Sequence, residues 1–163
     1  MDALTCLKTR RSVRRFLDRP VPRDTIQEIV DCGRMAATAN NAQPWVFVAI
    51  LEEATRREIA ALTDWGEFIA HAPACIAVFC TKTRYYLEDG SAASQNILNA
   101  ARAYGLGSCW VAGAGKPYAP KVAKLLGVPD DMPLVSLLAI GYPADEPSPV
   151  KKPLSDVLRW EKY

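Results

Sequence analysis

Four short apolar runs most constrain how this 163-residue chain can fold. They lie at Trp45–Leu51, Ala74–Cys80, Ser108–Ala112 and Leu134–Ile140, and segments of helical character separate them. Each run has the length of a buried strand and is far shorter than the roughly 20 apolar residues that a membrane span needs. The length suits one domain over residues 1–163, built from alternating helices and strands, with no membrane partner.

The segments between these runs predict helices, and the end of the chain predicts an extended tail. The helices are expected just after Asp2, near residues 23–36, and at Glu52–Thr63, Asp89–Tyr104 and Pro120–Leu126. Residues 142–163 contain four prolines and end in Leu158, Trp160 and Tyr163. Because such a tail has aromatic residues but no core of its own, we expect it to pack on a partner subunit.

Composition excludes several classes of protein. The net charge of +2 gives no reason to expect nucleic acid as a partner. The single histidine, His71, excludes sites built from several histidines, and no metal site is expected. Five widely spaced cysteines without a C-x-x-C motif favour buried, reduced thiols over disulfides or zinc. Together with an N-terminus unlike a signal peptide, this predicts a cytoplasmic protein.

The first segment that could carry chemistry is Thr9–Phe16. It places three guanidinium groups and a hydroxyl within five residues, at Arg10, Arg11, Ser12 and Arg14. Planar bidentate donors of this kind suit a phosphate group. The alternatives are a solvated basic turn or a patch that contacts nucleic acid.

Two further segments could contact a flat ligand. Ala37–Trp45 carries Thr38, Asn41 and Gln43, which can donate to and accept from a heterocycle, although an ordinary capping loop has the same composition. Gly105–Lys116 matches neither the Walker A nor the G-x-G-x-x-G pattern. Its small residues would let a flat ligand approach the backbone closely, or would simply pack beside a helix end.

Taken in order, these segments make the chain resemble a nitroreductase-family flavoprotein. The resemblance extends over nearly the whole chain and is carried by R-R-S-V-R-R-F, T-A-N-N-A-Q-P-W, A-S-Q-N-I-L-N-A-A, G-L-G-S-C-W-V-A-G, L-L-G-V-P and A-I-G-Y-P. It implies an α+β fold of three layers, with a central, mostly antiparallel sheet flanked by helices. It also implies a homodimer with FMN at the interface between the subunits.

The resemblance assigns expected roles to individual residues. Arg10 and Ser12 would hold the phosphate and ribityl end of FMN with Arg11 nearby, and Arg14 would face the pyrimidine edge. The loop with Thr38, Asn41 and Gln43 would touch the flavin of the other subunit. The backbone at Val111, Ala112 and Gly113 would meet flavin N5, and Lys151 and Lys152 would complete the phosphate clamp.

The activity implied is a ping-pong reaction in which NAD(P)H reduces FMN and a nitroaromatic, quinone or related acceptor then takes the electrons. A same-fold dehalogenase, a flavin-fragmenting enzyme and a flavin-storage protein with little turnover remain alternatives. The chain departs from longer members in two places. Trp65–Ile69 lacks their flavin-contacting Asn and Lys, and only Lys82–Glu88 stands where they insert lid helices, so Tyr85 or Tyr86 could cover the flavin.

Overall fold

The computed structural model describes residues 1–163 and contains one antiparallel sheet of four strands in the order β1-β2-β4-β3. The strands are β1 (Trp45–Ile50), β2 (Ala74–Cys80), β3 (Gly107–Ala112) and β4 (Leu134–Gly141). Every neighbouring pair is antiparallel. All four apolar runs are therefore strands, with bounds that differ from the prediction by one residue at one end of β1, β3 and β4.

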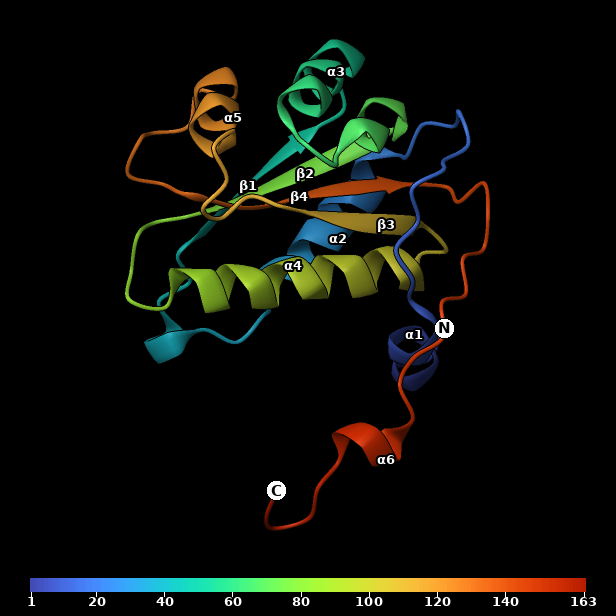
Figure 1. Cartoon of the computed structure of the whole chain (residues 1–163). Coiled ribbons are helices and arrows are strands. Elements are labelled where there is room, and N and C mark those ends of the chain that lie inside the picture. Colours follow the sequence, from blue (N-terminus) through green and yellow to red (C-terminus); the bar gives the residue numbers. More distant parts are fainter.

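Helices cover both faces of this sheet and make three layers (Figure 1). One face is covered by α2 (Arg23–Arg34) and α4 (Tyr86–Ala103). The opposite face is covered by α3 (Glu53–Leu62), α5 (Ala119–Leu125) and the 3-10 helix η2 (Glu67–His71). The α+β architecture of three layers is confirmed.

The two central strands explain why the sequence shows continuous apolar runs rather than alternation. Every residue of β2 and β4 is buried, because both faces of each strand are covered. Along β2, Cys75 and Phe79 join the core under α3 and α5, whereas Ile76 and Val78 join the core under α2 and α4. The sheet thus separates two hydrophobic cores.

Two hydroxyl groups lie inside the core under α2 and α4 and form a hydrogen bond with one another. The hydroxyl oxygens of Ser94 on α4 and Ser136 on β4 are 2.7 Å apart, and both residues are fully buried. Ser94 donates to the carbonyl of Gly90, so Ser136 is the donor to Ser94. A buried hydroxyl without such a partner would destabilise the fold by about 1–3 kcal/mol.

A glycine allows α2 and α4 to pack closely. A Cβ atom at Gly33 of α2 would lie 2.6 Å from Cγ1 of Ile97 on α4, closer than real contacts allow.

The start of α4 differs from the sequence prediction, since the helix begins at Tyr86 rather than Asp89. Asp89 therefore lies within the first turn of the helix, and its carboxylate accepts from the backbone N–H of Ala39 in another loop, at 3.0 Å.

Other short elements were not predicted. They are the 3-10 helices η1 (Ala39–Asn41) and η2 and a one-turn helix, α6 (Leu154–Val157). Each is shorter than the window over which hydrophobic periodicity can be read. Four of the five cysteines are buried, as expected, whereas Cys32 is exposed.

Both ends of the chain project from the layered body (Figure 1). Helix α1 (Ala3–Thr9) buries only Cys6, and Leu4 and Leu7 are 66% and 57% exposed. Every residue from 148 to 163 is exposed, and α6 stands clear of the body.

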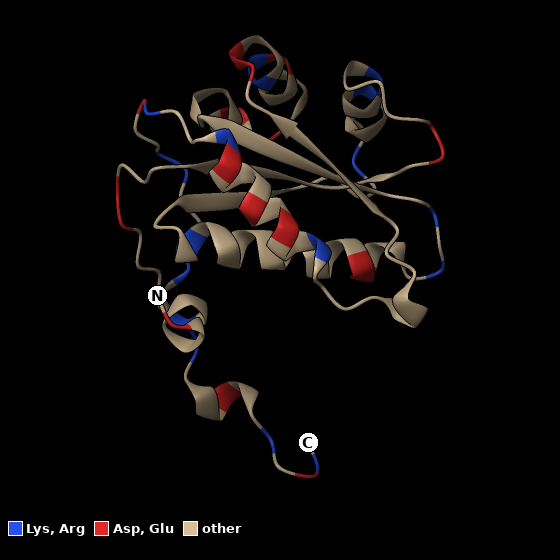
Figure 2. Ribbon diagram, turned by 180° about the vertical axis from the view of Figure 1, so that it is seen from behind, with Lys and Arg blue, Asp and Glu red and all other residues tan.

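Charged side chains occur on the helices and loops while the four strands carry none (Figure 2). No helix combines the length and apolar character needed to cross a membrane.

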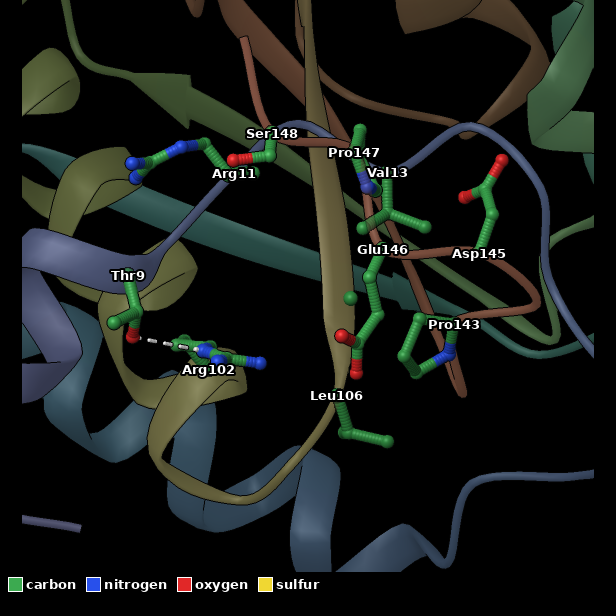
Figure 3. A pocket seen from close by; sticks show the side chains of 11 residues that line it. Thr9, Arg11, Val13, Arg102, Leu106, Pro143, Asp145, Glu146, Pro147 and Ser148 are labelled. Atoms are coloured by element: carbon green, nitrogen blue, oxygen red, sulfur yellow. Dashed lines mark hydrogen bonds between the residues drawn. The ribbon is translucent and has the colours of Figure 1, made fainter. Parts of the chain in front are cut away.

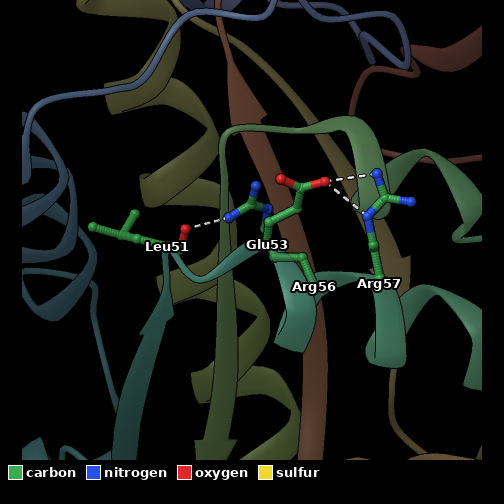
Figure 4. A network of polar contacts seen from close by, with 4 residues as sticks. All are labelled: Leu51, Glu53, Arg56 and Arg57. Atoms are coloured by element: carbon green, nitrogen blue, oxygen red, sulfur yellow. Dashed lines mark hydrogen bonds and ion pairs between the residues drawn. The ribbon is translucent and has the colours of Figure 1, made fainter.

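A buried arginine fixes the connection between β1 and α3 (Figure 4). Arg56 of α3 is 7% exposed, and its guanidinium donates to the carbonyl of Leu51 just after β1. The neighbouring Arg57 pairs with Glu53 at 2.6 Å on the helix surface. Burial lowers the pKa of Arg56.

Candidate functional site

The arginine segment, residues 10–16, runs along the open edge of the sheet. Strand β3 pairs only with β4, so its other edge has no strand beside it. There the backbone N–H of Val13 donates to the carbonyl of Ser108 at 2.9 Å, in a short parallel bridge. The predicted phosphate-binding residues are therefore fixed to the sheet by their own backbone.

The same edge determines which backbone groups of β3 are free. In an antiparallel strand, the N–H and C=O groups of successive residues point to opposite sides. Gly113 donates inward, to the carbonyl of Val135 at 3.0 Å, and Ser108 accepts outward from Val13. By this alternation the N–H of Ala112 points off the open edge, whereas those of Val111 and Gly113 point toward β4.

A basic cleft of about 470 Å³ lies between the arginine segment and the tail. Its lining contains four cationic residues and no acidic residue, which is the environment that a phosphate group requires. The lining comprises Arg10, Arg11, Ser12, Arg14, Pro147, Ser148, Pro149 and Lys151. Lys152 is exposed and does not line this cleft.

The arginines of the basic cleft differ in how they are held. The guanidinium of Arg11 donates to the carbonyls of Lys8 and Arg10, each at 2.8 Å, and so caps the end of α1. Arg10 and Arg14 make neither an ion pair nor a side-chain hydrogen bond within the chain. These two are the arginines left free to bind a ligand.

An aromatic cleft of about 440 Å³ adjoins the basic cleft, because Arg14 lines both. It is lined largely by apolar groups from β3, η2 and the loop before α5, with charged side chains among them. The lining comprises Arg14, Asp64, Trp65, Glu67, Phe68, Cys109, Trp110, Val111, Ala112, Lys116 and Tyr118. Arg14 Cζ lies 5.9 Å from the ring centre of Phe68.

Two titratable groups of the aromatic cleft remain protonated. Burial raises the pKa of the Cys109 thiol, although Arg14 and Ser12 act in the opposite direction. Burial also raises the pKa of the Tyr118 phenol, and the charge of Asp64 adds to that effect. The phenol donates to the carbonyl of Ala112 and so ties the loop after β3 to the strand. Neither group is a nucleophile at neutral pH.

The loop with Thr38, Asn41 and Gln43 lies elsewhere in the same chain. Asn40, Asn41 and Gln43 have positive φ angles of 53°, 54° and 46°, and Asp89 anchors the loop to the start of α4. The arginine segment lies near the other end of α4, where Arg102 donates to Thr9 at 3.2 Å. Thirteen residues of α4 separate these two anchors, or about 20 Å.

The predicted site residues thus form two groups within one chain. None of Thr38, Asn41 and Gln43 lines the basic or the aromatic cleft, and neither do Tyr85 and Tyr86. Tyr86 packs instead against the core under α2 and α4.

A third, smaller pocket of about 210 Å³ lies on the other side of Arg11, between the end of α4 and the tail (Figure 3).

Several residues of the aromatic cleft were not found from the sequence. They come from the turn before η2, from η2 itself and from the loop before α5, namely Asp64, Glu67, Phe68, Lys116 and Tyr118. Trp65, Glu67 and Phe68 stand out in the sequence only as part of a stretch that departs from the longer relatives, and Lys116 only as the end of the segment Gly105–Lys116. No spacing links these two segments, which are brought together only by the sheet. Nowhere in the chain do three or more His, Cys, Asp or Glu side chains gather so as to hold a metal ion.

Comparison with known proteins identifies the fold and its family. The family model described as "Nitroreductase family" matches residues 7–74 and 63–142. A protein of Methanothermobacter thermautotrophicus, provisionally named NADH dehydrogenase/NAD(P)H nitroreductase, is 33% identical over 155 residues, covering 90% of this chain and 80% of the relative.

Two solved structures are similar over nearly the full length. A protein of Bacteroides thetaiotaomicron, provisionally named in the same way, has a TM-score of 0.94 and 29% identity, covering 99% and 98% of the two chains. A nitroreductase-like protein of Desulfovibrio desulfuricans, solved in complex with FMN, has a TM-score of 0.86 and 27% identity, covering 100% and 98%. With a family model that matches most of its length, this chain belongs to the nitroreductase family.

Proposed function

We propose that this protein is an FMN-dependent oxidoreductase that takes electrons from NAD(P)H and passes them to a small-molecule acceptor. The observation that carries this proposal is the union of an acid-free basic cleft with an aromatic cleft at an open sheet edge. One suits a phosphate and the other a flat heterocycle. The names of the relatives, which include NAD(P)H nitroreductases and an FMN complex, support the same assignment.

The residues of the two clefts fit FMN. Arg10, Ser12 and Lys151 would hold its phosphate and ribityl end, since they line the basic cleft without a competing carboxylate. Arg14, shared by both clefts, would face the pyrimidine edge. Of the backbone groups predicted to meet N5, the N–H of Ala112 is the one that points off the sheet edge. Arg11 would not bind FMN directly but holds the end of α1 in place through its side-chain hydrogen bonds.

Bound FMN supplies two-electron transfer from NAD(P)H to the acceptor, and the chain supplies position and charge. The guanidinium of Arg14 is unpaired within the chain and would stabilise negative charge at the pyrimidine edge. The buried, protonated Cys109 and Tyr118 shape the cleft without taking part as nucleophiles. Donor and acceptor would use the same open face in turn. We expect nitroaromatic compounds and quinones as acceptors.

A second copy of the chain would complete the site. The apolar side chains of α1 and the tail are exposed, including Leu4, Leu154 and Trp160 at 66%, 69% and 77%. Burying one such side chain contributes about 1.5–3 kcal/mol, so these surfaces favour a homodimer. In that dimer the loop with Asn41 and Gln43 of one chain would reach the flavin held by the arginine segment of the other.

The test is to load the purified protein with FMN and add NADH or NADPH without oxygen. We expect a bound flavin whose visible absorption band bleaches with one or both nicotinamides and returns when an acceptor is added. A bound flavin that neither nicotinamide reduces would point to flavin storage instead. A protein that cannot be loaded with FMN would overturn the proposal. Light scattering of the loaded protein should give the mass of two chains.

A further inference from the structure

Four unpaired charges surround the aromatic cleft. Arg14 and Lys116 are cationic, and Asp64 and Glu67 are anionic; we call the latter two the rim carboxylates. The three ion pairs of the chain involve other residues. Neither rim carboxylate accepts a side-chain hydrogen bond within the chain, and both are exposed. Their charge is therefore free to act on whatever occupies the cleft.

The rim carboxylates are held in place by a tight turn. Gly66 lies between them, and a Cβ atom there would collide with the hydroxyl of Thr63. That hydroxyl donates to the carbonyl of Ala60 at the end of α3, at 2.9 Å. The carbonyl of Gly66 accepts from the N–H of Ile69, which is fully buried. The backbone of the turn is thus anchored on both sides, and it carries the two carboxylates at the rim.

Both rim carboxylates line the same cleft as Ala112, where electrons would be transferred. Asp64 lines the cleft beside the Tyr118 phenol, which donates to the carbonyl of Ala112; burial raises the pKa of this phenol, and the charge of Asp64 adds to that effect. The N–H of Ala112 is the group that we assign to flavin N5. Glu67 is next in the chain to Phe68, whose ring lies 5.9 Å from Arg14 Cζ. Both carboxylates therefore share the lining of one cleft with Arg14 and Ala112.

We propose that the rim carboxylates lower the two-electron reduction potential of FMN bound in the aromatic cleft, in opposition to Arg14 and Lys116. This inference rests on the proposed function. When NAD(P)H reduces FMN, a C–H bond of the nicotinamide breaks, an N–H bond forms at N5, and NAD(P)⁺ leaves. FMN gains two electrons and one proton, so one negative charge is added to its ring. Nearby carboxylates raise the free energy of that charge.

The consequence is a weaker preference for reduced FMN over oxidised FMN. The oxidised ring is neutral, so the rim carboxylates act on it much less. Their effect on the phosphate of FMN is the same in both redox states and cancels in the ratio of the two affinities. A lower potential makes the reduced protein a stronger electron donor. It would suit acceptors that are themselves difficult to reduce.

The test uses the FMN-loaded protein with Asp64→Asn, Glu67→Gln and the double substitution. The matched control is Glu58→Gln, which removes the same charge from an exposed position on α3 outside both clefts. The reduction potential is measured by anaerobic equilibration with a redox dye, and dissociation constants are measured for oxidised and reduced FMN. Far-UV circular dichroism verifies that each variant is folded.

We expect each single substitution to raise the affinity for reduced over oxidised FMN by roughly three- to tenfold. A tenfold change corresponds to about 30 mV for a two-electron couple. The double variant should show the larger shift, and 0.5 M salt should reduce it by screening. A double variant that binds FMN with the potential of the Glu58→Gln control would overturn this inference alone. Failure of the unmodified protein to bind FMN would overturn the proposed function.

Discussion

Arg10→Ala tests the assignment of the phosphate site most directly. Arg10 lines the acid-free basic cleft and makes no ion pair or side-chain hydrogen bond within the chain. The substitution therefore removes a contact to the ligand without breaking one inside the protein. A charge-assisted hydrogen bond contributes about 1.5–3 kcal/mol. Since about 1.4 kcal/mol is a tenfold change in affinity, the dissociation constant for FMN should rise roughly 10- to 150-fold.

The matched control is Arg15→Ala. Arg15 lies on the same segment but is exposed, lines neither cleft and only approaches Asp145 at 3.9 Å. Surface pairs of this kind contribute about 0–1 kcal/mol to stability. Quenching of FMN fluorescence on binding gives both dissociation constants, and the difference should shrink in 0.5 M salt. If Arg10→Ala bound FMN within about threefold of Arg15→Ala, the phosphate assignment would be wrong.

Three further predictions concern stability and assembly. Gly33→Ala should lower the free energy of unfolding by about 1–3 kcal/mol in urea titrations, because the new Cβ meets Ile97, and Ile97→Val should recover part of the loss. Burial raises the pKa of Cys75 and of Cys80 from 9.0 to about 12, so from pH 9 to 12 the unfolded chain releases protons that the folded chain keeps. Stability should therefore fall as pH rises through that window, with a smaller slope in Cys75→Ala; an equal slope would contradict the burial of this thiol. Removal of residues 150–163 should give a monomer with weakened FMN binding in light scattering and titration, whereas a dimer of unchanged affinity would show that the tail serves neither purpose.

The strands could be predicted from the sequence because the central ones are covered on both faces. Continuous apolar runs such as Ala74–Cys80 follow directly from that burial. The direction of the strands does not follow, because a parallel sheet covered on both faces gives the same pattern. The family resemblance supplied the antiparallel arrangement.

The candidate site was predicted in part, and the missing part depends on strand register. Two local motifs are visible in the sequence: the arginines at residues 10–14 and the small residues at the end of β3. Which backbone N–H points outward at Val111–Gly113 depends on the pairing of β3 with β4, and no local pattern encodes it. The burial of the tryptophans could not be predicted either: Trp65 is exposed, whereas Trp110 packs against the core under α2 and α4.

Helix α4 links two half-sites. Asp89 holds the loop with Asn41 at the start of α4, and Arg102 at its end holds Thr9, the residue just before the arginine segment. In the proposed dimer each chain contributes its arginine segment to one flavin and its loop to the other. A chain carrying Arg10→Ala and a chain carrying a defective loop are therefore complementary: a mixed dimer has one site with both defects and one site with none. Two variants that each bind FMN weakly, once their chains are exchanged, would together regain one intact flavin site per dimer.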